Sequence, residues 1–237
     1  MKVERVSSGI PGLDKLIEGG FVKGSTNLVA GGTGTGKTIF GCQFLLEGLE
    51  KGESVLYVTL EQRIEDILDD VSVFGWDEKF RKYLDAKKFT IVTQFPSSIA
   101  ELKTIVYDLL EKNMAKRFVL DSLSVATLGW KETEREIGRI RRDLFDFLTA
   151  MKKSDVTSLL ISEIPEDEEK KLSRFGIEEF LADSVVKLNY LGVGGAQFST
   201  LEIRKMRRTD HERGIFQMEF SKAGLKIITE KGKPKFQ

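Results

Sequence analysis

Residues 31–38 constrain the fold of this chain more than any other segment. They read Gly-Gly-Thr-Gly-Thr-Gly-Lys-Thr and match the phosphate-loop pattern G-x-x-x-x-G-K-[ST] at every position. The mostly apolar residues 25–30 predict a short strand before the loop, and apolar residues at helical spacing predict a helix over residues 39–50. A strand, a glycine loop and a helix in this order are typical of α/β proteins that bind phosphate groups.

The residue types of this loop suit an anion. Glycines permit backbone angles that turn several N–H groups toward one phosphate, and the start of the following helix adds partial positive charge. The Lys37 side chain can reach the β- and γ-phosphates of a nucleotide, and the Thr38 hydroxyl can bind Mg²⁺. We therefore predict a nucleotide site, in which Lys37 also counts as catalytic. Its residues are Gly32, Thr33, Gly34, Thr35, Gly36, Lys37, Thr38 and Ile39.

Composition and charge narrow the possible partners. The 237 residues are 41% hydrophobic, as in globular proteins, and Lys plus Arg equal Asp plus Glu at 37 each. A net charge of zero gives no global attraction to nucleic acid or acidic membranes. No apolar run is long enough to span a bilayer, and the N-terminus lacks the apolar core of a signal peptide. The single cysteine, Cys42, cannot form an internal disulfide, so we expect a buried apolar residue there and a cytoplasmic protein.

Strands and helices are predicted to alternate after the phosphate loop. This alternation predicts right-handed crossovers and a mostly parallel sheet flanked by helices, which is an α/β fold. A short helix is also expected before the loop, at residues 13–18. The expected strands are residues 54–60, 89–95, 117–121 and 156–162, and the expected helices are residues 63–73, Ser97 or Ser98 to about residue 114, and 134–153.

Beyond residue 162 the pattern changes. Residues 163–176 form a charged loop, and four strands follow without helices between them, at residues 184–191, 200–206, 215–220 and 225–228. Such a run predicts an antiparallel extension at one edge of the sheet. No segment rich in Pro, Gly or Ser separates the two parts, so we expect residues 1–237 to form a single domain.

Two acidic residues follow predicted parallel strands. Asp121 ends the segment Arg-Phe-Val-Leu-Asp, and Glu61 comes directly after residues 54–60. The carboxyl ends of parallel strands meet at the edge of the sheet where ligands bind. There Asp121 can hold Mg²⁺ together with Thr38, and Glu61 can orient or deprotonate the water that attacks the γ-phosphate. A structural role for Glu61, as an acid at the start of a helix, is the alternative.

A basic segment, residues 204–213, contains His211, the only histidine of the chain. One histidine and one distant cysteine cannot form a zinc site, so we predict no metal there. Three interpretations are open from the residues alone. The segment could be a solvated hairpin, a patch for nucleic acid, or a set of cations that reach phosphates bound by a neighbouring chain.

Several segments together resemble a known family. Gly-Ile-Pro-Gly-Leu-Asp at residues 9–14, the phosphate loop and Asp121-Ser122 resemble RecA-superfamily ATPases. Residues 176–183 and 201–207 resemble the KaiC branch of that superfamily. The resemblance covers nearly the whole chain, as one KaiC-type domain. It implies a RecA-like P-loop NTPase fold that binds ATP or ADP with Mg²⁺.

The resemblance also implies a hexameric ring with ATP between subunits. One subunit supplies the phosphate loop, Asp121 and the catalytic Glu61, and its neighbour supplies a Lys-x-Arg finger with further contacts close to it. The residues that correspond to these neighbour contacts are Lys205, Arg207, Thr209 and His211. The resemblance therefore favours the interpretation of the basic segment as a set of cations that reach phosphates bound by a neighbouring chain.

Two departures from the family bear on the expected activity. KaiC-type domains have two adjacent glutamates after the second strand, whereas this chain has Glu61-Gln62, so hydrolysis is expected to be slow. The kinase half of the clock protein carries a Ser-Thr phosphorylation pair where this chain has Glu179-Phe180. Neither residue can accept a phosphoryl group, so the chain resembles the ATPase half.

Three functions are therefore compared. The leading one is an ATP-hydrolysing ring. The second is a DNA-handling recombinase or helicase, but its candidate DNA loop, residues 163–175, has more acidic than basic residues, which opposes phosphate binding. The third is a regulatory scaffold that binds nucleotide with little turnover, which Gln62 favours. No motif identifies a protein partner, the process served or the residues that hold adenine.

Overall fold

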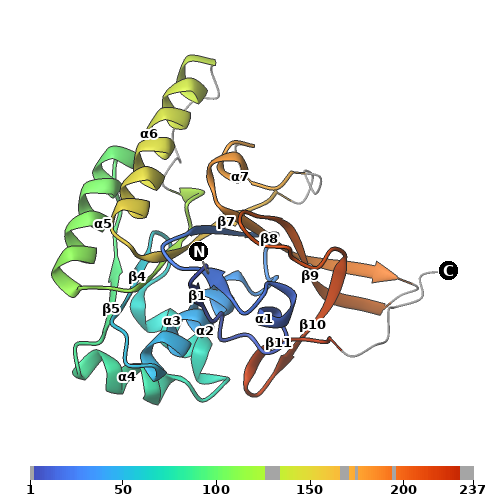
Figure 1. Cartoon of the computed structure of the whole chain (residues 1–237). Coiled ribbons are helices and arrows are strands. Elements are labelled where there is room, and N and C mark those ends of the chain that lie inside the picture. The colour runs from blue at the N-terminus through green and yellow to red at the C-terminus, as the bar shows by residue number, and fades with distance from the viewer. Residues whose placement is uncertain (1–2, 126–133, 166–170, 174–175, 194–195, 230–237) are drawn as a thin grey trace.

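The computed structural model describes residues 3–125, 134–165, 171–173, 176–193 and 196–229. Nine strands form one sheet in the order β11-β10-β9-β8-β3-β7-β6-β4-β5 (Figure 1). Six of them run parallel, namely β3 (Thr26–Gly31), β4 (Val55–Thr59), β5 (Phe89–Thr93), β6 (Arg117–Asp121), β7 (Thr157–Glu163) and β8 (Ser184–Val193). The predicted mostly parallel sheet is confirmed.

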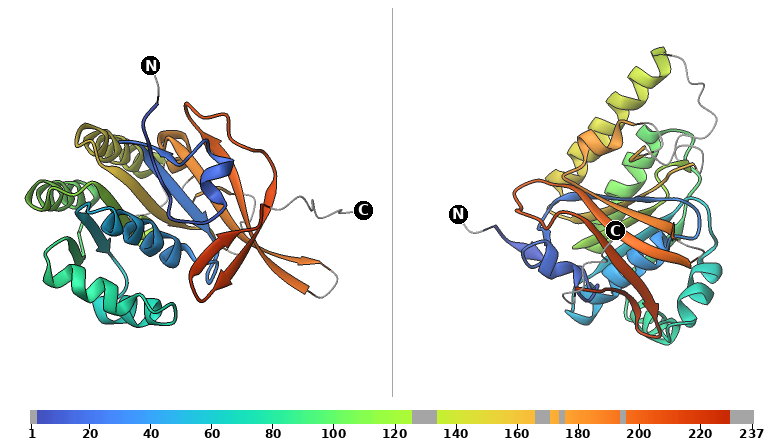
Figure 2. Two further views of the ribbon diagram at one scale, coloured as in Figure 1. Left: turned by 60° about the horizontal axis from the view of Figure 1, so that its bottom comes forward. Right: turned by 90° about the vertical axis from the view of Figure 1, so that its right-hand side faces the viewer.

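The antiparallel extension is confirmed as well, with one correction. It consists of β9 (Ala196–Met206), β10 (Ile215–Ser221) and β11 (Gly224–Ile227), at the side of the molecule away from the long helices (Figure 2). Residues 184–191 were expected to belong to it, but β8 pairs in parallel with β3, with Ser184 opposite Asn27. The connection from β7 through the single helical turn α7 (Glu178–Leu181) returns the chain to the amino end of the sheet, so β8 runs in the same direction as β3.

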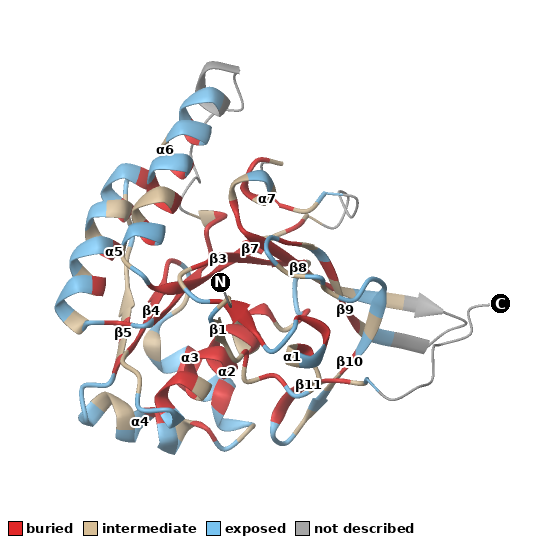
Figure 3. Ribbon diagram, in the orientation of Figure 1, coloured by how far each residue is buried: buried red, intermediate tan, exposed pale blue. Residues whose placement is uncertain are grey.

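Helices cover both faces of the parallel strands because alternate strand residues point to opposite sides. On β6, Val119 belongs to the core under α2 (Lys37–Glu50), α3 (Ile64–Ser72) and α4 (Asp77–Asp85), and its neighbour Phe118 belongs to the core under α5 (Ile99–Asn113) and α6 (Glu134–Lys153). Figure 3 shows the buried residues along the strands and on the inner sides of the helices.

Helix ends follow local signals in the sequence. The Ser98 hydroxyl accepts a hydrogen bond from the Glu101 amide at 3.1 Å and caps α5, which selects Ser98 over Ser97 as the first capping residue. The predicted helix over residues 134–153 is α6. The helix expected at residues 13–18 is shorter, as α1 (Leu13–Leu16).

Three small elements had no counterpart in the predictions, namely helix α4, the helical turn α7 and a ribbon near the start of the chain. Helix α4 is mostly charged and shorter than the window over which a helical period is read, so the spacing of its apolar and aromatic residues Phe80, Tyr83 and Leu84 was missed. A two-stranded ribbon, β1 (Arg5–Val6) with β2 (Phe21–Val22), pairs the start of the chain with the segment after α1. Two-residue strands lie below the length at which alternation can be recognised.

Residues 122–133, between β6 and α6, lie partly outside the described residues. In the part of the chain that the structure covers, no helix is both long and apolar enough to cross a bilayer. Cys42 is buried on α2, as expected for a small apolar residue.

Candidate functional site

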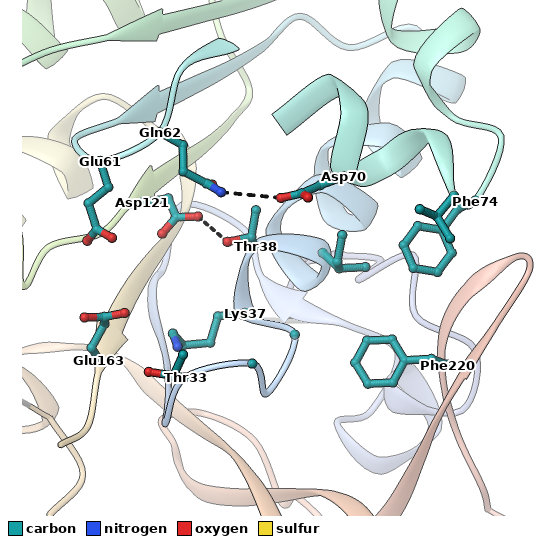
Figure 4. A pocket seen from close by; sticks show the side chains of 14 residues that line it. Thr33, Lys37, Thr38, Glu61, Gln62, Asp70, Phe74, Asp121, Glu163 and Phe220 are labelled. Carbon is teal, nitrogen blue, oxygen red and sulfur yellow. Dashed lines mark hydrogen bonds between the residues drawn. The ribbon is translucent and has the colours of Figure 1, made fainter. Parts of the chain in front are cut away.

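A cavity of about 460 Å³ opens at the carboxyl edge of the parallel strands (Figure 4). Charged side chains lie at one end of this cavity, and Phe74 and Phe220 lie at the other. The residues that line it are Thr33, Gly34, Gly36, Lys37, Thr38, Ile39, Glu61, Gln62, Asp70, Val73, Phe74, Asp121, Glu163 and Phe220. Most of the predicted phosphate-loop residues, with both predicted acids, therefore surround one space.

The phosphate loop has the backbone that its glycines were expected to allow. Gly34 has φ 74° and Gly36 has φ 92°, in the left-handed region that favours glycine. Gly36 directly precedes α2, and a Cβ atom at Gly36 would lie 2.6 Å from Cζ of Phe220. Any larger residue at Gly36 would therefore both strain the loop and displace the cavity wall.

Lys37 lies inside the curl of the loop. Its Nζ donates to the carbonyl oxygen of Gly32 at 2.8 Å, and the Thr35 hydroxyl donates to the same oxygen at 2.9 Å. Burial lowers the pKa of Lys37, while the nearby charges of Glu163, Asp121 and Glu61 oppose this shift. An ammonium group held in a partly desolvated loop interacts more strongly with a phosphate than one in bulk water.

One oxygen of the Asp121 carboxylate accepts hydrogen bonds from two hydroxyl groups. The Thr38 hydroxyl donates to Oδ2 at 2.7 Å, and the Tyr57 hydroxyl donates to the same Oδ2 at 2.6 Å. Burial raises the pKa of Asp121, and the hydrogen bonds from Tyr57 and Thr38 oppose that rise. The expected proximity of Thr38 and Asp121 is thus present in the structure.

These oxygen donors fit Mg²⁺. A hydroxyl and a carboxylate are hard ligands, and Mg²⁺ at nucleotide sites takes few protein ligands because phosphate oxygens and water complete its shell. Over the described residues, no group of three or more His, Cys, Asp or Glu could hold a metal ion without such help.

Glu61 follows β4 and faces the cavity. Thr59 fixes the turn, because its Oγ1 accepts from the Glu61 amide at 3.2 Å and from the Gln62 amide at 2.9 Å. The Ser122 hydroxyl donates to the Glu61 carboxylate. Desolvation raises the pKa of Glu61, the Ser122 hydrogen bond opposes it, and the charges of Glu163 and Asp121 raise it further. A carboxyl with a raised pKa at a ligand-facing rim suits proton transfer.

Gln62 does not join Glu61 at the charged end. Its Nε2 lies 3.4 Å from Oδ2 of Asp70 on α3, so its amide turns toward that helix (Figure 4). A single carboxylate, that of Glu61, therefore extends into the cavity from this turn.

Sequence reasoning missed several residues of the cavity. Glu163 is the last residue of β7, and its side chain lies near Lys37 in the cavity (Figure 4). From the sequence, Glu163 was expected only in the charged loop after residue 162. The rule that identified Asp121, an acid at the carboxyl end of a parallel strand, could have identified Glu163 too. Phe74 and Phe220, which line the cavity, carried no signal, because apolar and aromatic residues usually belong to the core. The same holds for Tyr57, which is buried and donates a hydrogen bond to Asp121.

The residues predicted to contact a nucleotide on a neighbouring chain lie away from the cavity, toward the end of the sheet where the parallel strands begin. Lys205 is opposite Val185 on β8, and Val185 is level with Leu28 on β3. The Arg207 amide donates to the Asp183 carbonyl, and the Asp183 amide donates to that of Thr26. Arg207 is therefore level with the beginning of β3, whereas the phosphate loop follows its end.

The side chains of this basic segment bind their own chain. Lys205 Nζ donates to the carbonyl oxygens of Ala182 at 2.6 Å and Glu179 at 2.8 Å. Burial foremost, and then the charge of Arg207, lower the pKa of Lys205. Arg207 remains 51% exposed, with Nη1 3.7 Å from the Asp183 carboxylate. The candidate DNA loop, residues 163–175, lies largely outside the described residues.

Comparisons with known proteins agree with this architecture. The family model described as "ATPase: KaiC" matches residues 6–232. Circadian clock protein KaiC3 of Synechocystis is 32% identical to this chain, over 95% of this chain and 46% of KaiC3. A UPF0273 protein of Methanopyrus kandleri is 30% identical, over 98% of this chain and 94% of that protein. The crystal structure of a KaiC-like protein from Pyrococcus horikoshii OT3 matches with a TM-score of 0.85 and 39% identity, over 96% of this chain and 100% of that one.

The fold and the phosphate-loop cavity define a RecA-like α/β nucleotide-binding protein. Within that class, this chain belongs to the KaiC ATPase family. It spans about half the length of the curated circadian clock relatives it matches, and nearly the whole length of the two archaeal proteins. The family predicted from the sequence is confirmed.

Proposed function

We propose that this protein binds ATP with Mg²⁺ in the cavity at the carboxyl edge and hydrolyses it slowly, at a site that a neighbouring subunit of a ring completes. One observation supports the proposal above others. The Thr38 hydroxyl meets the Asp121 carboxylate at 2.7 Å beside the curled phosphate loop, in the same cavity that Glu61 enters. These are the parts that phosphoryl-transfer sites of P-loop proteins share.

Each polar residue has a distinct task in this proposal. Thr38 and Asp121 would hold Mg²⁺, which supplies positive charge beside the β- and γ-phosphates when bound. Lys37 leaves the Gly32 carbonyl and binds phosphate oxygens. Glu61 accepts a proton from the attacking water, and the Ser122 hydroxyl orients the Glu61 carboxylate.

The apolar end of the cavity suits the nucleoside. Val73 is 75% exposed and Phe220 is 42% exposed, although both are apolar, and they line the cavity together with Phe74. An aromatic base placed there would cover this apolar surface. The choice of adenine over guanine rests on the family.

The separation of Lys205 and Arg207 from the phosphate loop supports a shared site. Strand β3 spans about 16 Å from Thr26 to Gly31 at about 3.3 Å per residue, and Arg207 is level with its first residue. Measured along β3, Arg207 therefore lies about 16 Å from the phosphate loop of its own chain, and Lys205, which is level with Leu28, lies about 10 Å from it. In a closed ring, each chain presents this edge to the cavity of the next chain.

The nucleotide site is tested by Lys37→Ala. Loss of the ammonium should weaken binding of a fluorescent ATP analogue by about 10- to 100-fold, because charge-assisted hydrogen bonds contribute about 1.5–3 kcal/mol. The matched control is Lys51→Ala at the other end of α2, where Nζ pairs with Glu47 at 2.9 Å. Equal affinity of Lys37→Ala and the parent would contradict the assignment of the loop.

A regulatory scaffold with little turnover is the second candidate. The orientation of Gln62 toward Asp70 favours it, because only one carboxylate reaches the cavity from the turn after β4. A steady-state ATPase assay separates the two functions. A scaffold would bind the analogue through Lys37 and show no hydrolysis that depends on Glu61.

A further inference from the structure

The Arg5 side chain joins the start of the chain to a turn 204 residues later. Arg5 lies on β1, and its side chain is only 12% exposed. Nη1 donates to the Thr209 hydroxyl at 3.0 Å, and Nη2 donates to the carbonyl oxygen of Arg208 at 3.2 Å. Thr209 Oγ1 in turn lies 3.4 Å from the carbonyl oxygen of Arg207. One guanidinium therefore reaches successive residues of the turn formed by residues 207–212.

The same guanidinium is fixed by the N-terminal segment. Nη1 also donates to the carbonyl oxygens of Gly20 at 3.1 Å and Ile17 at 3.3 Å, and Nη2 pairs with the Glu18 carboxylate. The fork of an arginine can hold these partners together, whereas a lysine ammonium cannot span them in fixed directions.

The turn of residues 207–212 needs such support. Arg208 has φ 59°, in the left-handed region that side chains other than glycine rarely adopt. Its carbonyl is one of the groups that Arg5 binds. At the far end, the Glu212 amide donates to the carbonyl oxygen of Leu16 at 2.9 Å. The N-terminal segment therefore holds this turn near both of its ends.

We propose that Arg5 is a positioning residue for the nucleotide site of the adjacent subunit. By fixing the turn of residues 207–212, it aims Arg207, Thr209 and His211 at the nucleotide that the neighbouring chain binds. This inference rests on the shared site proposed above. The alternative is that Arg5 only holds the N-terminal segment in place. The two roles differ in whether loss of Arg5 impairs the face of the subunit that carries residues 207–212.

Three variants distinguish these roles. Arg5→Ala removes every contact of the guanidinium, and Arg5→Lys keeps the charge without the fork. Lys23→Ala is the matched control, because its Nζ pairs with Glu4 at 2.8 Å on the same ribbon. We expect ATP hydrolysis to fall roughly 10- to 100-fold in Arg5→Ala, since small misplacements of catalytic groups have effects of that order. Arg5→Lys should recover only part of the rate, and Lys23→Ala should match the parent.

Hydrogen exchange tests the positioning directly. In Arg5→Ala, the amides of residues 207–213 should exchange faster, while those of residues 31–38 should stay as in the parent. Unchanged exchange at residues 207–213 would overturn the role of Arg5, whatever the ATPase rate. A rise over the whole chain would show a general loss of stability and would also overturn it.

Subunit mixing tests which face is affected. Arg5→Ala mixed with Glu61→Gln should regain activity, because some interfaces then combine an intact Glu61 with an intact turn. Arg5→Ala mixed with Arg207→Ala should not, because both changes damage the same face. Activity returning in the second mixture would overturn the inference. If Arg207→Ala and Glu61→Gln do not complement each other either, the shared site itself fails, and the exchange result shows separately whether Arg5 holds the turn.

Discussion

The two edges of the parallel sheet carry polar residues arranged in opposite ways. At the carboxyl edge, Lys37, Glu61 and Asp121 come from separate segments and converge on one cavity. At the amino edge, Lys205 and Arg207 bind backbone and carboxylate groups of their own chain, and Arg207 stays half exposed. The first edge holds a nearly complete binding site, and the second holds cations without a phosphate site of their own. The contrast supports the proposal that one chain contributes residues to two different sites.

The largest expected effect is that of Arg207→Ala. If Arg207 stabilises charge on the transferring phosphoryl group of a neighbour, hydrolysis should fall by roughly 10³- to 10⁵-fold, while the phosphate loop keeps its affinity for nucleotide. The measurement is a steady-state ATPase assay with the purified protein.

Arg204→Ala is the control for this variant. Arg204 lies on β9, the strand that ends just before Arg207, and pairs with Glu202 at 2.7 Å, so its loss removes a surface charge without touching the proposed site. Equal rates in the two variants, whether both are high or both are low, would contradict a specific role for Arg207.

Glu61→Gln is expected to have the next largest effect. Nucleotide should still bind, but hydrolysis should fall by roughly 10²-fold or more, because the amide cannot accept the proton of the attacking water. Glu65→Gln, an exposed acid in the first turn of α3, is the control and should retain the parent rate. An unchanged rate in Glu61→Gln would leave the scaffold as the better description.

The pH profile sharpens this test. A general base acts in its ionised form, and the pKa of Glu61 is raised by desolvation and by its acidic neighbours. The rate should therefore decline on acidification at a pH above that expected for an ordinary glutamate. This decline should be absent from the residual activity of Glu61→Gln.

The smallest expected effect is one of stability. Because burial raises the pKa of Asp121, its charge destabilises the folded state at neutral pH. In Asp121→Asn, one oxygen can still accept from both Thr38 and Tyr57, since both donate to Oδ2. The variant without ligand should melt about 2–4 °C higher for each ~1 kcal/mol recovered. Adding nucleotide with Mg²⁺ should raise the melting temperature of the variant less than that of the parent. A melting temperature below that of the parent without ligand would contradict this account of the site.

Local patterns predicted most of the fold. Helix α5 was predicted from its apolar period and from its capping residue. The cap could be recognised because Ser98 and Glu101, which form it, are close in sequence. Strand β8 pairs antiparallel with β9, as expected, but its parallel pairing with β3 was not predicted, because this pairing depends on the path of the chain through α7 and not on the composition of the strand. Helix α4 was missed because only Phe80, Tyr83 and Leu84 of its nine residues are apolar or aromatic.

The candidate site likewise contains residues that local patterns predicted and contacts that they did not. The loop and the two acids were accessible from the sequence, because each follows a predicted strand. The Tyr57 contact with Asp121 joins residues 64 positions apart, and the Arg5 contact with Thr209 joins residues 204 apart. Such pairings follow from the register of the sheet and the packing of the ribbon, which no local pattern specifies.

The most direct test of the contrast between the two edges mixes two impaired variants, Glu61→Gln and Arg207→Ala, under conditions where subunits exchange. Mixed rings contain interfaces with an intact Glu61 on one side and an intact Arg207 on the other. ATP hydrolysis should therefore return on mixing and should increase with the extent of exchange. If exchange is verified and no activity returns, or if Arg207→Ala is fully active alone, the site is not shared between subunits.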